Sequence, residues 1–74
     1  MVEVKVKERY FKVSIGNGCM TIIKSNDNAV TLKEVKEHAI YLFGVYMFNG
    51  VEEVAPDDKE ISWCVAMGGR IHEM

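Results

Sequence analysis

The sequence predicts an α+β fold, an antiparallel β-sheet of four to five strands with one α-helix packed on one face, in the order ββ(β)αββ. Three observations predict it: a capped amphipathic segment over residues 31–50, apolar–polar alternation on both sides of that segment, and a Gly-Asn-Gly turn at 16–18. Seventy-four residues give room for one domain, 1–74, and a hydrophobic content of 49% is typical of a globular chain.

The first strands are predicted from alternation with a period of two. Valines alternate with charged residues over 2–7, which predicts a strand with one wet face, suited to a sheet edge. The alternation resumes at Phe11, Val13 and Ile15 with the opposite parity. A bulge or short turn is therefore expected near residues 8–9.

The Gly-Asn-Gly segment predicts a two-residue hairpin turn, because glycine and asparagine tolerate positive φ. A turn at Asn17-Gly18 sets Ile15 opposite Met20, and a turn at Gly16-Asn17 sets Val13 opposite Met20. Either register places the apolar residues of both strands on one face, which a three-residue turn would not do. These residues are Phe11, Val13, Ile15, Met20 and Ile22.

The helix begins with a capping box, in which Thr31 accepts from the N–H of Glu34 and Glu34 reaches back to the N–H of Thr31. Val30 and Val35 occupy the hydrophobic-staple positions. The turn formers at 25–28 predict a loop before it. The core-facing stripe follows helical spacing and comprises Leu32, Val35, Ala39, Leu42, Phe43 and Tyr46.

Two glycines compete to end this helix. Gly50 would end the helix after Asn49 by adopting a left-handed conformation. Gly44 could end it earlier in the same way, and residues 45–48 would then form a strand followed by a hairpin turn at Asn49-Gly50. The long helix is preferred because that hairpin would set Tyr46 opposite Glu53. Its cost is one interior glycine, about 1 kcal/mol.

The C-terminal part is predicted as two strands. Residues 51–55 form a short strand, and residues 56–59 form a turn that begins with Pro56. Bulky residues at 61, 63, 65 and 67 alternate with small ones, which predicts a last strand ended by Gly68-Gly69 and followed by a frayed tail.

Two groups of residues are candidates for binding a partner. Clustered like charge favours docking to a basic surface, and five acids lie within nine residues: Glu52, Glu53, Asp57, Asp58 and Glu60. Tyr41, Val45 and Phe48 would project from the outer face of a helix that continues to Gly50, where apolar residues favour a protein contact. The alternatives are a solvated hairpin for the acids and core positions for the apolar residues.

The sequence offers little for catalysis or cofactor binding. No nucleophile, base or phosphate-binding motif is recognisable, so we expect no catalytic, cofactor-binding or metal-binding residue and no enzyme. Cys19, Cys64, His38 and His72 lack the clustered spacing of structural zinc modules. A small metal-binding or thiol protein is kept as an alternative.

Charge is divided along the chain, although the net charge is only −2. Residues 1–24 are basic, and residues 33–60 are acidic. A nucleic-acid-binding accessory protein is therefore a second alternative, with phosphate contacts from the first strands. It is less favoured because the chain as a whole is acidic. The residues concerned are Lys5, Lys7, Arg9, Lys12 and Tyr10.

These observations together predict a non-enzymatic protein-binding module, a small stand-alone inhibitor or regulator of a larger protein, with a homodimer as a further expectation. In size and layout alone it resembles small inhibitors of the phage anti-defence kind, including anti-CRISPR proteins. The start lacks the apolar region of a secretory signal, and the apolar run at 39–48 is half the roughly 20 residues of a membrane span. We expect no membrane partner and a cytoplasmic location with free thiols.

Overall fold

The structure is a computed structural model, and it describes residues 8–74. The strand predicted over residues 2–7, together with Lys5 and Lys7, lies outside the described residues. The elements are β1 (Arg9–Ile15), β2 (Cys19–Ser25), α1 (Leu32–Phe43), β3 (Phe48–Val54), α2 (Lys59–Ala66) and β4 (Ile71–Glu73). The predicted α+β class is confirmed.

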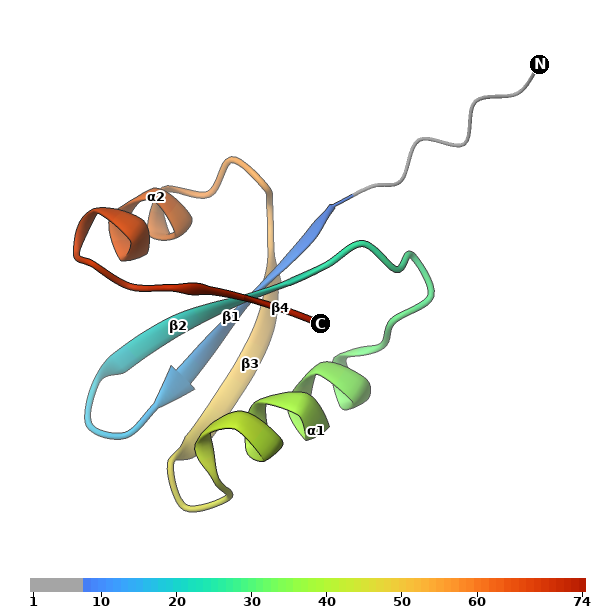
Figure 1. The fold of residues 1–74 in the computed structure, drawn as a ribbon, viewed down its shortest axis with the longest axis vertical. Coiled ribbons are helices and arrows are strands. Elements are labelled where there is room, and N and C mark those ends of the chain that lie inside the picture. The colour runs from blue at the N-terminus through green and yellow to red at the C-terminus, as the bar shows by residue number, and fades with distance from the viewer. Residues whose placement is uncertain (1–7) are drawn as a thin grey trace.

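Within residues 8–74, four strands form one mixed sheet in the order β3-β1-β2-β4. β1 is antiparallel to both β2 and β3, whereas β4 runs parallel to β2. The two helices lie on opposite sides of the sheet (Figure 1). The prediction of a wholly antiparallel sheet with a single helix is therefore wrong in two respects: β4 is parallel, and a second helix is present.

The hairpin between β1 and β2 explains why both faces of the sheet need a cover. Ile15 pairs with Cys19, so the turn between the strands has three residues, 16–18. Gly16 and Gly18 of this turn have positive φ values of 56° and 83°. Both predicted registers are wrong by one residue. A one-residue shift exchanges the faces of a strand, so Ile22 lies on the face opposite Phe11.

Two separate cores result. The first lies between the sheet and α1 and comprises Phe11, Val13, Ile23, Val30, Val35 and Ala39. The second lies on the other face, where Ile22 packs with Ile61 and Cys64 of α2. Phe11 and Ile22, one from each core, are both fully buried. The apolar residues of β1 and β2 are thus shared between two faces.

The last predicted strand, over residues 61–67, is instead the helix α2. Asp58 caps it, since its carboxylate accepts from the N–H of Glu60 at 2.8 Å. Ile61 and Cys64 are three residues apart, so one face of a helix carries both toward Ile22. The bulky residues at 61, 63, 65 and 67 have the period of a strand, whereas Ile61 and Cys64 have the spacing of one helix face. The burial of Ile61 and Cys64 against Ile22 favours the helix.

The start of α1 is as predicted. The Thr31 hydroxyl accepts from the N–H of Glu34 at 3.2 Å, and Val30 and Val35 are buried in the same cluster. One detail differs: the Glu34 carboxylate accepts from the Thr31 hydroxyl at 3.3 Å rather than from the Thr31 N–H. The helix entry is therefore fixed by local interactions.

The end of α1 is not as preferred from the sequence. The helix ends at Phe43, and Gly44 follows with φ of 90° while its N–H donates to the Ile40 carbonyl at 2.8 Å. This positive φ strongly favours glycine. The shorter alternative is right about the helix end, but residues 45–47 form a turn and Asn49-Gly50 lies within β3. Three residues of the predicted core stripe are exposed: Leu32, Leu42 and Tyr46.

Candidate protein-interaction surface

The predicted acidic cluster is largely engaged by the chain itself. Lys12 of β1 binds Glu52 at 2.7 Å and Glu60 at 3.0 Å. Arg9 binds both carboxylate oxygens of Glu53 at 2.9 Å. Asp58 caps α2, and Asp57 is exposed in the turn before it. The cations of β1 therefore offset much of the negative charge that the sequence offers as a docking patch.

Arg9 also positions the loop between β2 and α1. Its guanidinium donates to the Val30 carbonyl at 2.6 Å and to the Asn28 carbonyl at 3.2 Å. The hydrogen bond with Glu53 raises the pKa of Arg9. Of the cations considered for phosphate binding, Arg9 and Lys12 thus both contact carboxylates within the fold.

Lys12 predicts a dependence of stability on alkaline pH. Hydrogen bonds with Glu52 and Glu60 raise the pKa of Lys12 from 10.5 to about 12. A group whose pKa is raised by folding stabilises the fold fully below its unfolded pKa and loses that effect as pH rises through the folded value. The stabilisation by Lys12 should therefore be lost between pH 10.5 and about 12.

Urea unfolding of the wild type and of Lys12→Met, followed from pH 9 to about 12, would measure this dependence. Methionine keeps an aliphatic stem but has no charge. We expect the midpoint of Lys12→Met to fall less steeply than that of the wild type within this range. Equal slopes would show that the ion pairs of Lys12 contribute no net stability.

The residues with metal-binding or nucleophilic chemistry are dispersed. Cys64 lies on the buried face of α2, and Cys19 is exposed at the start of β2; both are free thiols. His72 packs its ring edge-on against Phe43, with ring centroids 5.3 Å apart, and His38 lies near Tyr41. Within residues 8–74, no group of three or more His, Cys, Asp or Glu side chains could hold a metal ion. The structure does not gather the four zinc candidates of the sequence into one site.

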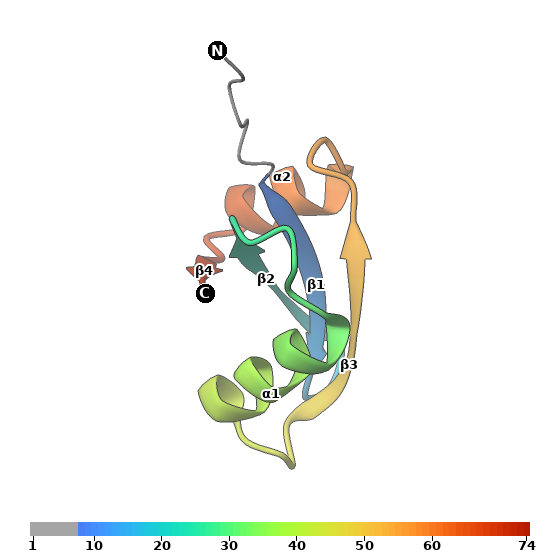
Figure 2. The ribbon, with the colours of Figure 1, turned by 90° about the vertical axis from the view of Figure 1, so that its right-hand side faces the viewer.

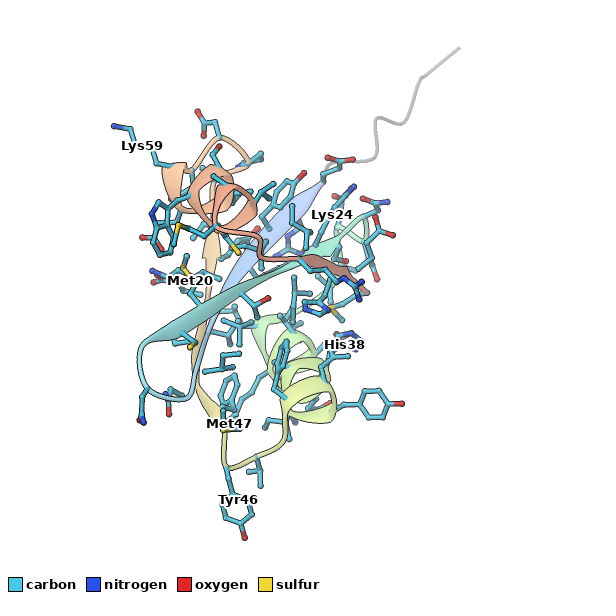
Figure 3. All side chains as sticks on the ribbon, turned by 60° about the vertical axis from the view of Figure 1, so that its left-hand side comes forward. Met20, Lys24, His38, Tyr46, Met47 and Lys59 are labelled. Atoms are coloured by element: carbon cyan, nitrogen blue, oxygen red, sulfur yellow. The ribbon has the colours of Figure 1, made fainter. Side chains whose placement is uncertain are left out.

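A surface of exposed apolar residues forms where α1 ends and the chain turns into β3. The exposed fractions are 83% for Tyr41, 60% for Val45, 98% for Tyr46 and 48% for Met47. Tyr46 projects beyond the ribbon at this end of the molecule (Figure 3). We name these four residues the apolar tip.

Of the three residues predicted on the outer helix face, the apolar tip contains two. Tyr41 and Val45 belong to it, but Phe48 is half-buried and packs against the first core. Tyr46 was predicted to lie in the core, and this prediction is wrong; Met47 was not among the predicted binding residues. The signal that would have found both is Gly44, since a helix that ends there releases the next three residues into a turn.

Hydrogen bonds hold in place the turn at residues 45–47, which carries three residues of the apolar tip. The backbone N–H of Gly16 donates to the Met47 carbonyl at 2.8 Å. The side-chain amide of Asn49 donates to the Gly16 carbonyl at 2.6 Å. The N–H of Met47 also donates to the Gly44 carbonyl at 3.2 Å. The turn is thereby tied to the β1–β2 hairpin, so its exposed side chains extend from an anchored backbone.

A second apolar surface lies near α2. A groove of about 260 Å³ runs between the start of β2 and α2. Trp63 and Met67 line it and are 57% and 70% exposed. Met20 points toward it from β2 (Figure 3). This groove provides an exposed aromatic residue away from the apolar tip, which is useful as a control.

No protein-family model, curated protein or solved structure matches this chain. Among residues 8–74, neither helix has the length and apolar character needed to cross a membrane.

Proposed function

We propose that this chain is a protein-binding module that docks through the apolar tip and acts as a small inhibitor or regulator of the protein it contacts. The observation that carries the proposal is the exposure of Tyr41 in the last turn of α1 and of Val45, Tyr46 and Met47 in the anchored turn that follows. Tyrosine and methionine are enriched in the cores of protein interfaces. The acidic residues are assigned a supporting role, because most of them are held by groups of the same chain.

The apolar tip has the energetic properties of a binding site. Covering about 150 Å² of a tyrosine ring at about 25 cal/mol per Å² is worth roughly 4 kcal/mol before the costs of association. The hydrogen bonds of Gly16 and Asn49 hold the backbone beforehand. Less ordering is then required on binding, which favours affinity.

We also propose a cytoplasmic location. Cys19 and Cys64 are both free, one exposed and one buried. Reducing compartments keep such thiols unpaired. Fractionation of the source cells, with a detection tag on this chain, would test it; recovery from an oxidising compartment would contradict it.

Binding through the apolar tip is testable by comparing three baits: wild type, Tyr41→Ser/Tyr46→Ser and Trp63→Ser. Each is immobilised and exposed to a lysate of the source cells. We expect wild type and Trp63→Ser to retain the same foreign protein and the tip variant to lose it, because Trp63 is a comparably exposed aromatic outside the apolar tip. Equal retention by all three baits, or no specific retention by any, would contradict the proposal.

A further inference from the structure

We propose that the groove beside α2 binds a soft monovalent metal ion, Cu(I), through the sulfur atoms of Met20, Cys64 and Met67. The groove lies outside the apolar tip, so this inference is independent of the proposed function. Three features carry it: the concentration of sulfur in one groove, a thiol that a neighbouring glycine leaves uncovered, and two flexible thioether side chains that line the same groove.

Sulfur is concentrated in this groove. The groove has a volume of about 260 Å³, and four of the six sulfur-bearing residues within residues 8–74 line it. These four are Cys19, Met20, Cys64 and Met67. Thiolate and thioether sulfur are ligands that select Cu(I). The groove therefore gathers donors of the chemical kind that this ion prefers.

Cys64 supplies the anionic ligand. It is 4% exposed, it belongs to the second core, and it lines the groove. Gly69 lies close against it, because the N–H of Gly69 donates to the Cys64 carbonyl at 2.8 Å. A Cβ atom at position 69 would lie 2.6 Å from the Cys64 sulfur. Glycine at this position thus lets the chain pass beside the thiol without a side chain that would cover it.

The two methionines approach the thiol from different elements. Met20 extends from β2 toward α2 (Figure 3) and packs against the core that contains Cys64. Met67 follows Cys64 by three residues, at the end of α2 that leads into β4 (Figure 2), so both side chains lie on one face of the helix. Methionine has three rotatable side-chain bonds and adapts to its surroundings. One thiolate and two thioethers can therefore close around one ion from two sides.

The ligand set favours Cu(I) over zinc. Zinc in proteins takes thiolate, imidazole and carboxylate ligands, and no three such side chains gather anywhere in the described part of the chain. Cys19 does not complete a zinc set in the groove. It pairs with Ile15, which packs against the first core, so the Cys19 side chain lies on the other face of the sheet. The site is thus three-coordinate, with sulfur ligands alone.

Binding exchanges a proton for the metal ion. The Cys64 thiol releases its proton to solvent as its sulfur bonds to Cu(I), and neither copper nor sulfur changes its oxidation state. The negative thiolate and the positive ion then neutralise each other. A neutral filled site suits a place beside an apolar core, where an unpaired charge would be costly.

Anaerobic titration with Cu(I), supplied as its bicinchoninate complex, tests whether the site exists. Trp63 lines the groove and is the only tryptophan of the chain, so its fluorescence reports an ion bound there. We expect the wild type to remove one ion per chain from the chelator while the Trp63 emission falls. Zn(II) should leave the emission unchanged. Retention of all the copper by the chelator, or an equal response to Zn(II), would overturn the inference.

Two matched pairs of variants identify the ligands. Met67→Leu keeps the apolar volume of an exposed residue, so it should fold normally and weaken the binding of Cu(I) about tenfold or more. Met47→Leu, in the apolar tip, should bind as the wild type does. Cys64→Ala should abolish binding, whereas Cys19→Ser should retain it. Wild-type affinity in Met67→Leu, or loss of binding in Cys19→Ser, would overturn the assignment even if Cys64→Ala fails to fold.

Discussion

Replacing Phe11 with alanine is expected to lower the free energy of unfolding by about 3–5 kcal/mol. Phe11 is fully buried, and it belongs to β1, the strand that pairs with both β2 and β3. Truncation would leave a cavity between the sheet and α1. A domain of 74 residues has a total stability of about 4–11 kcal/mol, so the variant would approach the limit of folding.

Urea unfolding followed by circular dichroism would measure this loss. Phe11→Leu keeps most of the apolar volume and should cost less than half as much, whereas Tyr41→Ala changes an exposed residue and should stay within about 0.5 kcal/mol of the wild type. A Phe11→Ala variant as stable as Tyr41→Ala would show that the core beneath α1 does not hold the fold together.

Ile22→Ala is expected to have the second largest effect, a loss of about 2–5 kcal/mol. Ile22 is fully buried on the other face of the sheet, against Ile61 and Cys64. α2 is eight residues long, too short to persist as a helix without tertiary contacts. The variant should therefore loosen α2 more than α1.

Hydrogen exchange of the backbone amides would resolve the two helices. We expect the amides of α2 to lose protection first in Ile22→Ala, while those of α1 exchange more slowly. Ile22→Val removes one methylene and should cost about 0.5–1.5 kcal/mol with the same order of protection. Equal loss of protection in both helices would mean that the two cores unfold as one unit.

The parts of the fold that the sequence predicts correctly depend on neighbours in the chain. The entry of α1 needs only Thr31 and Glu34, three residues apart, and Val30 and Val35 are close in sequence as well. The hairpin between β1 and β2 is likewise signalled by its glycines. Such signals act before any tertiary contact forms, so they can be read from the sequence alone.

The errors arise where one residue decides between two arrangements. A third residue in the hairpin turn moves Ile22 to the other face, and that shift creates the second core. Ile61 and Cys64 are three residues apart, so a helix carries both onto this second core, whereas a strand would place them on opposite faces. Gly44 similarly decides whether Tyr46 lies within a helix or in an exposed turn.

The candidate surface was only partly predictable for the same reason. The sequence shows that Glu52 and Glu53 carry negative charge. It does not show that Lys12 and Arg9, some forty residues away, bind them. A longer helix predicts Tyr41 and Val45 on its outer face; in the structure they are exposed although the helix ends at Phe43, Tyr41 in its last turn and Val45 in the turn that follows. Long-range pairing is the information that local patterns lack.

The order of the strands and helices along the sequence also affects the chain while it is being synthesised. Residues 9–54 contain every strand and helix of the first core, whereas the second core requires α2 and β4. Ile22 thus lacks the cover of α2 and β4 until residues 59–71 have left the ribosome, although Tyr10, Met20 and Val54 already flank it. A nascent chain would display this apolar sheet face during that interval, and such a surface is the kind that chaperones bind.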